Sequence, residues 1–195
     1  MCSWCWGFSP VITRLKKEFG DKLNISLNLG GLRPGTTEAI TPVLRDEILH
    51  HWHDVHHMTD QTFQFDGAMP EGFVYDTEPA SRAVLCMGKL QPSDTLAYFS
   101  AIQSAFYTQG KDVTQQDVLT ELTDLFSIDT EKFQALLNSE EMRTLTREHF
   151  KRSHQAGVRG FPTLIWQQEK EIETISTGYI AWDRISEILK SRLPK

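Results

Sequence analysis

The chain has 195 residues, of which 39% are hydrophobic and 24% are charged, and its net charge is −6. These proportions are typical of one globular domain, or of one domain with a large insertion, and they exclude a disordered chain. The acidic balance and the lack of a Lys/Arg cluster exclude nucleic acid as an expected partner. No apolar run reaches the roughly 18 residues that a membrane span needs, so no membrane partner is expected.

The first predicted element is a helix over residues 5–18, whose apolar positions repeat at helical spacing. Pro10 lies inside this helix and should kink it. Residues 24–29 then alternate polar and apolar side chains, which predicts a strand. Residues 37–155 carry helical patterns almost throughout. The chain finally returns to two short strands, at 161–166 and 172–175, and to a C-terminal amphipathic helix that begins near Trp182.

The chain has three cysteines, Cys2, Cys5 and Cys86. A secreted disulfide scaffold would contain more cysteines, usually in an even number. The C-x-x-C spacing of Cys2 and Cys5 points to redox or metal chemistry, and a structural zinc site would need a second ligand pair that the sequence lacks. Redox chemistry is therefore favoured. Cys86 stands among apolar residues and is expected to be buried in the core.

Cys2 stands at the start of the predicted helix, where unpaired N–H groups and the helix dipole stabilise a thiolate. We therefore expect the pKa of Cys2 to fall below the free value of about 8.5 and Cys2 to be the nucleophile. Cys5, one turn further and more shielded, would resolve the mixed disulfide. Trp4 lies between the cysteines and is expected to be exposed to clients. Trp6 is expected to pack in the core.

Pro162, in the run Gly160-Phe161-Pro162-Thr163, stands at the start of a predicted strand, where a residue without an N–H is tolerated. This run resembles the start of the corresponding strand in the thioredoxin fold, where a cis proline lies against the active cysteines. We expect a cis Phe161–Pro162 bond, with the backbone of Phe161 presented to an extended substrate. An ordinary trans proline at a strand start is the alternative.

Three runs carry a family resemblance: Met1-Cys2-Ser3-Trp4-Cys5-Trp6-Gly7-Phe8, Gly30-Gly31-Leu32-Arg33-Pro34-Gly35 and Gly157-Val158-Arg159-Gly160-Phe161-Pro162-Thr163. Together they resemble the DsbA-like thioredoxin proteins, and more narrowly the cytoplasmic predicted disulfide isomerases of the FrnE type. The resemblance implies a thioredoxin-like α/β domain formed by residues 1–36 and 156–195, interrupted by an all-helical insertion at 37–155. In that family a strand precedes the cysteine motif. Only Met1 precedes Cys2 here, so we expect that strand to be absent from this chain.

The sequence therefore predicts a thiol–disulfide oxidoreductase or isomerase that acts on protein or peptide disulfides in the cytoplasm. Cys2 and Cys5 would be catalytic, and Trp4, Phe161 and Pro162 would contact the substrate. No resident cofactor and no metal are expected, and glutathione stays open as a co-substrate. The direction of the redox reaction, the clients and the oligomeric state are not fixed by the sequence.

Two other functions stay open. A glutathione-dependent transferase or isomerase can use the same fold, although such relatives usually carry serine where Cys2 stands. A non-enzymatic metal-binding or client-holding module would use His50, His53 and His57, whose spacing places them on one helix face and could hold a divalent metal. A solvated helix face explains these histidines more simply.

Overall fold

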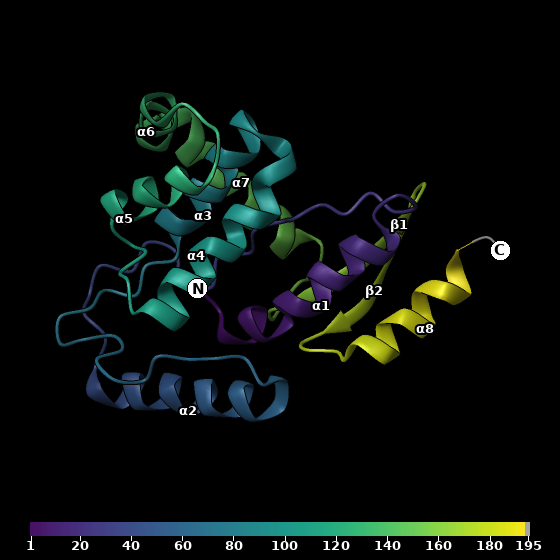
Figure 1. Ribbon diagram of the computed structural model, residues 1–195, viewed down its shortest axis with the longest axis horizontal. Helices are drawn as coiled ribbons and strands as arrows, with labels where there is room; N and C mark the ends of the chain where they lie inside the picture. Colours follow the sequence, from purple (N-terminus) through teal and green to yellow (C-terminus); the bar gives the residue numbers. More distant parts are fainter. Residues whose placement is uncertain (194–195) are drawn as a thin grey trace.

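The computed structural model describes residues 1–193 and has a helix-rich α/β fold with one two-stranded sheet. Its elements, in chain order, are α1 Ser3–Phe19, α2 Pro42–Thr59, α3 Glu78–Leu90, the short 3-10 helix Pro92–Asp94, α4 Thr95–Gln109, α5 Gln116–Glu121, the 3-10 helix Leu122–Leu125, α6 Thr130–Asn138, α7 Glu140–Gln155, β1 Thr163–Gln168, β2 Glu171–Thr177 and α8 Trp182–Arg192. In Figure 1, α1 lies in the middle of the molecule, with α3 to α7 on one side and β1, β2 and α8 on the other. No helix in the described part of the chain combines the length and apolar character that membrane crossing demands.

The helix α1 begins at Ser3, slightly earlier than the sequence predicted, and Cys2 is its N-cap residue. Pro10 has no N–H to donate to the carbonyl of Trp6, one turn earlier. The hydroxyl of Ser9 and the side-chain amide of Gln61 donate to that carbonyl instead, at 2.8 and 2.9 Å. The loop that follows α2 therefore supports α1 at the point where the proline interrupts its hydrogen bonding.

The predicted strand over residues 24–29 is wrong as a hydrogen-bonded strand, because the structure assigns no strand there. The side chains still alternate: Ile25, Leu27 and Leu29 turn inward, while the residues between them are exposed. A strand also needs a ladder partner, and the sheet within residues 1–193 contains only β1 and β2. The polar–apolar pattern correctly predicted which side chains of this segment turn inward, but it could not predict whether a neighbouring strand would pair with it.

The C-terminal part follows the sequence prediction closely. β1 and β2 form an antiparallel hairpin that pairs Thr163 with Thr177 and Gln168 with Glu171, with one irregularity after Leu164. The turn between them contains Glu169, which has a positive φ of 53°. The helix α8 then packs beside α1.

The buried side chains form two hydrophobic cores. The larger core joins Trp6 and Leu29 to α2, α3, α4 and the helices around them, and Trp52 lies within it at 1% exposure. Cys86 belongs to this core with 0% exposure, as predicted. The members of the smaller core come from α1 and α8: Phe8, Val11, Leu15, Phe19, Ile185 and Leu189.

The division into a thioredoxin-like domain, formed by residues 1–36 and 156–195, and a helical insertion at 37–155 stays a prediction. Residues 194 and 195 of the first domain lie outside the part that the structure describes. The expected absence of the family's preceding strand from this chain stays a prediction as well. What the structure adds is that α1 contributes to both cores, with Trp6 in the larger one and Phe8 in the smaller.

Candidate functional site

The two cysteines of the motif lie at the N-terminal end of α1. The carbonyl of Cys2 accepts the N–H of Cys5 at 3.0 Å and the N–H of Trp6 at 3.1 Å, which winds the first turn of the helix around the motif. Both thiols are free and partly buried. No acidic residue lies in the first turn of α1 to oppose a thiolate.

The two thiols have opposite pKa shifts. A hydrogen bond from the Cys5 thiol lowers the pKa of Cys2 to about 7, against burial, and the backbone N–H groups of Cys5 and Trp4 add to the lowering. The same hydrogen bond, with burial, raises the pKa of Cys5 well above its ordinary value. The predicted lowering at Cys2 is confirmed. Near neutral pH, therefore, Cys2 is readily ionised and Cys5 keeps its proton.

The Phe161–Pro162 bond is cis, as the sequence predicted. This loop lies against the motif, because the Cys2 sulfur is 3.6 Å from the Phe161 carbonyl oxygen, which accepts the thiol hydrogen. The loop is held at both ends. The Thr163 hydroxyl donates to the Gly160 carbonyl at 2.7 Å, and the Gly178 N–H donates to the Pro162 carbonyl at 2.7 Å. Residues far apart in the sequence thus meet at Cys2.

The loop from Gly30 to Gly35 packs against the aromatic ring of Phe161 through Gly30. A Cβ atom at Gly30 would overlap the aromatic ring of Phe161, so only glycine lets the loop approach this closely. A Cβ at Gly31 would meet the ring of Phe150 at 2.8 Å. The sequence analysis used this glycine pair only as part of the family resemblance and missed its contact with the site.

Tyr75 is a second residue that sequence reasoning missed. Its hydroxyl donates to the Met1 carbonyl at 2.6 Å, directly before Cys2. Burial raises the pKa of Tyr75 and of its neighbour Tyr107, so both phenols stay protonated. The ring of Trp6 stacks on Tyr107 with centroids 6.0 Å apart. Buried aromatic residues between positions 37 and 155, here Tyr75 and Tyr107, therefore pack against the cysteine motif and form its aromatic floor. No local sequence pattern could reveal this contact.

Trp4 is partly buried and packs against the larger core, so the expectation of an exposed Trp4 is wrong. The reason is its place in the first turn of α1, on the side that contacts the aromatic core. Trp6 is buried as predicted, at 8% exposure. The roles of Trp4, Phe161 and Pro162 in substrate binding stay predictions.

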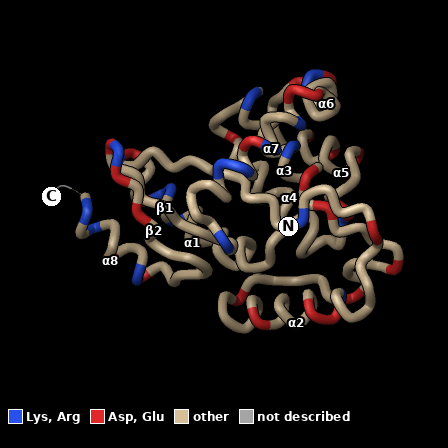
Figure 2. Tube along the Cα trace, turned by 180° about the vertical axis from the view of Figure 1, so that it is seen from behind, with Lys and Arg blue, Asp and Glu red and all other residues tan. Residues whose placement is uncertain are grey.

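The histidines of α2 are exposed to solvent. Within residues 1–193, no three His, Cys, Asp or Glu side chains are placed to hold a metal ion. The ring of His53 instead stacks on Phe65, with centroids 4.1 Å apart. Figure 2 shows acidic residues spread along the same helix. These observations favour the solvated helix face over the metal-binding alternative.

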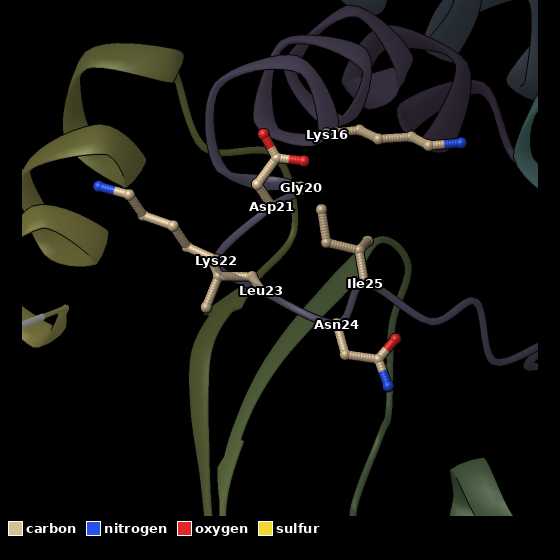
Figure 3. Close-up of a pocket in the computed structure, with 7 residues that line it drawn as sticks. All are labelled: Lys16, Gly20, Asp21, Lys22, Leu23, Asn24 and Ile25. Atoms are coloured by element: carbon tan, nitrogen blue, oxygen red, sulfur yellow. The ribbon is translucent and has the colours of Figure 1, made fainter.

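A surface hollow of about 480 Å³ lies at the far end of α1, lined by Lys16 and residues 20–25 (Figure 3). The helix rises about 1.5 Å per residue, so this hollow is roughly 25 Å from the cysteines. The side chains of Lys16 and Lys22 point away from one another in the close-up. Without converging polar groups, the hollow is a poor candidate for a binding site, and the chemistry stays with the cysteines.

Comparisons with known proteins identify the family and the fold. The family model of the DsbA-like thioredoxin domain matches residues 1–190. A proposed protein disulfide isomerase from Nitrosomonas europaea is 39% identical with a TM-score of 0.92, covering 98% of this chain and 92% of its own. The cytosolic disulfide reductase DsbM from Pseudomonas aeruginosa is 25% identical with a TM-score of 0.82, covering 98% of this chain and 94% of its own.

A 2-hydroxychromene-2-carboxylate isomerase shares the fold, with a TM-score of 0.67 at 14% identity, covering 97% of this chain and 89% of its own. No curated protein matches the chain. The family match spans nearly the whole chain, and the solved relatives are covered over nearly their whole length. The chain therefore belongs to the DsbA-like thioredoxin domain family of thiol–disulfide oxidoreductases.

Proposed function

We propose that this protein reduces or isomerises disulfide bonds in proteins and peptides, with Cys2 as nucleophile and Cys5 as resolving thiol. One observation carries the proposal: the two thiols at the start of α1 have opposite pKa shifts, lowered at Cys2 and raised at Cys5. Disulfide exchange needs an ionised thiol that attacks the substrate and a second thiol that stays protonated until the mixed disulfide has formed. This arrangement supplies both.

The reaction follows in two exchanges. The Cys2 thiolate attacks one sulfur of a substrate disulfide, which forms a Cys2–substrate disulfide and releases the other substrate sulfur as a thiolate. Cys5 then gives its proton to that thiolate or to solvent and attacks the Cys2 sulfur. The Cys2–Cys5 disulfide forms, the second substrate thiolate leaves, and two electrons have passed from the protein to the substrate. In isomerisation, a substrate thiol displaces Cys2 before Cys5 attacks.

The thiolate stability of Cys2 favours reduction or isomerisation over oxidation. A pKa of about 7 is close to that of a thioredoxin, whereas a strong oxidant lowers its nucleophile to about 3.5. The Pseudomonas aeruginosa relative is a cytosolic disulfide reductase, and it has also been solved with GSH. We accordingly propose a cytoplasmic reductant whose oxidised form is returned to the dithiol by two equivalents of glutathione.

The substrate would reach Cys2 along the Phe161–Pro162 loop. The Phe161 carbonyl accepts the Cys2 thiol hydrogen in the reduced protein, and it is freed as an acceptor once Cys2 is ionised or bonded to substrate. An extended peptide could then pair with this backbone, which would favour peptide clients. Trp4, which is partly exposed, would add apolar contacts, whereas Pro162 is buried within the loop.

The test is the redox equilibrium of the Cys2–Cys5 pair in glutathione buffers, with Cys86→Ala as background to leave two thiols. We expect a two-electron transition near the thioredoxin potential of about −270 mV rather than near about −120 mV. Cys2→Ser should abolish the transition, while Cys5→Ser should stop at a mixed disulfide with glutathione. If no Cys2–Cys5 disulfide formed, the proposal would fail. Glutathione turnover that survives Cys5→Ser would then favour the glutathione-dependent transferase or isomerase.

A further inference from the structure

Tyr75 reaches from a distant loop to the backbone that carries Cys2. Its hydroxyl donates to the Met1 carbonyl at 2.6 Å. That carbonyl belongs to the same peptide group as the N–H of Cys2, so the hydrogen bond acts directly on the backbone of the nucleophile. Tyr75 is only 4% exposed, and a hydrogen bond shielded from water is stronger than an exposed one.

The ring of Tyr75 is fixed by aromatic packing. It stacks on the ring of Phe106 with centroids 6.0 Å apart, and its centroid lies 5.8 Å from that of Phe73. Burial raises the pKa of Tyr75, and the charge of an ionised Cys2 raises it further. The phenol therefore stays protonated while Cys2 ionises, so it remains a hydrogen-bond donor throughout the reaction.

The backbone on both sides of Tyr75 is tied to an earlier loop. The Phe73 carbonyl accepts the N–H of Ile40 at 2.8 Å. The Thr77 N–H donates to the Arg33 carbonyl at 3.2 Å, and the Thr77 hydroxyl accepts the Arg33 N–H at 3.0 Å. The ring and the backbone of Tyr75 are thus both held, as is required of a group that sets the position of another.

The backbone of Cys2 is held on two sides. Its carbonyl accepts the N–H groups of Cys5 and Trp6 at 3.0 and 3.1 Å, which ties it to the first turn of α1. On the N-terminal side, the Tyr75 hydroxyl holds the carbonyl that precedes it. The position of the Cys2 sulfur, 3.6 Å from the Phe161 carbonyl oxygen, therefore depends on both attachments.

We propose that Tyr75 is a positioning residue for the nucleophile: its hydroxyl fixes the peptide group between Met1 and Cys2 and so keeps the Cys2 sulfur beside the Cys5 thiol. This inference rests on the proposed role of Cys2 as the attacking thiol. Without the Tyr75 hydroxyl, the peptide group is free to turn, and the sulfur spends less time near the Cys5 thiol and the first N–H groups of α1. The Cys2 thiolate is then less stable, because these are the groups that stabilise it.

The test is Tyr75→Phe, which removes the hydroxyl and keeps the ring that packs on Phe106. The rate of iodoacetamide labelling of Cys2 is measured against pH in a Cys86→Ala background. We expect the midpoint of this profile to rise by up to about 0.7 pH unit, the equivalent of one typical hydrogen bond. A residue that only stabilised the fold would leave the midpoint where it is.

The matched control is Tyr98→Phe. Tyr98 belongs to the same core, is fully buried, and donates to the Leu119 carbonyl at the same distance of 2.6 Å. Both variants should lose similar stability in denaturant unfolding, but only Tyr75→Phe should move the midpoint. An unmoved midpoint in Tyr75→Phe, or an equal shift in Tyr98→Phe, would overturn the inference. A wild-type protein that forms no Cys2–Cys5 disulfide would overturn the proposed function instead, since the labelling midpoint does not depend on that disulfide.

Discussion

The two halves of α1 lie in hydrophobic cores of different kinds. At its N-terminal end, Trp6 joins a large aromatic core in which the ring of Trp52 lies 5.2 to 5.7 Å from those of Tyr107, Phe63 and Phe106. Further along, α1 packs with α8 in a smaller core that includes Leu189. The cysteines lie where the two cores meet. Tyr75 of the large core donates to the Met1 carbonyl next to Cys2, and the carbonyl of Phe161, which leads into β1, accepts the Cys2 thiol hydrogen.

The site depends on both cores. The large core fixes the start of α1 and its aromatic floor, whereas the smaller core fixes the hairpin that places Phe161 against Cys2. A change deep in one core should therefore affect stability most. A change at the junction should affect the reaction of Cys2 more than it affects stability.

The largest effect is expected from Trp52→Ala in the large core. Truncating a fully buried aromatic residue costs about 3–5 kcal/mol through lost burial and the cavity left behind. Leu189→Ala in the smaller core should cost less, about 2–3 kcal/mol, because partly buried neighbours can relax into the space. Denaturant unfolding followed by circular dichroism measures both changes. Equal losses in the two variants would contradict the difference between the cores.

The junction is tested by Gly30→Ala. The added methyl group would overlap the ring of Phe161, and relieving such overpacking costs about 1–3 kcal/mol. Because Phe161 touches the Cys2 sulfur, we also expect slower disulfide exchange in this variant. The control is Gly160→Ala, beside Phe161, where the nearest atom is a Thr177 methyl group at 4.0 Å. If Gly160→Ala slowed exchange as much as Gly30→Ala, the close approach of the loop would not matter.

The sequence predicted the parts of the fold that local chemistry determines. The helix after Cys2, the cis bond at Pro162, the hairpin and α8 all have signals within a few residues of themselves. The direction of the Cys2 pKa shift was also predicted from the helix start, although its largest cause is the hydrogen bond from the Cys5 thiol and the backbone N–H groups contribute less.

The parts that the sequence missed depend on distant partners. Residues 24–29 alternate like a strand, but whether a ladder forms depends on a neighbour that the pattern cannot name. Trp4 was expected to be exposed because it lies between the cysteines, and its partial burial comes from helices much later in the chain. Gly30 and Tyr75 were missed for the same reason, since their contacts reach Phe161 and Met1.

The pH dependence of Cys2 sharpens the contrast between the two thiols at the junction. With a pKa of about 7, the thiolate fraction and the rate of alkylation should fall about tenfold per pH unit below that value and level off above it. An ordinary thiol would keep gaining reactivity up to about pH 8.5. Iodoacetamide labelling across this range, in a Cys86→Ala background, measures the midpoint.

The cause of the shift can be tested in the same way. The Cys5 thiol makes the largest contribution to lowering the Cys2 pKa, so Cys5→Ala should raise the midpoint toward the ordinary value. The midpoint of the parent protein serves as the control. A midpoint unmoved by Cys5→Ala would assign the lowering to the backbone N–H groups of the helix instead.

The smallest effect is expected from Gln61→Ala. The Gln61 amide supports the Trp6 carbonyl that Pro10 leaves without a donor, and it also donates to the Ser9 hydroxyl at 3.0 Å. Because the Ser9 hydroxyl still reaches that carbonyl, the loss should be about 1 kcal/mol, the net value of a typical hydrogen bond. Denaturant unfolding measures it, with Gln64→Ala as control, since the amide of Gln64 makes only an exposed bond to the Asp66 carbonyl at 3.3 Å.

The size of this loss decides how α1 is held at the proline. If Gln61→Ala is no worse than Gln64→Ala, Ser9 alone satisfies the Trp6 carbonyl, and the loop after α2 contributes through the Trp6 indole, which donates to the Thr62 carbonyl at 3.1 Å. If the loss is near 1 kcal/mol, Gln61 supports α1 within one turn of Cys5. The orientation of the motif then depends on the large core as well as on the helix itself.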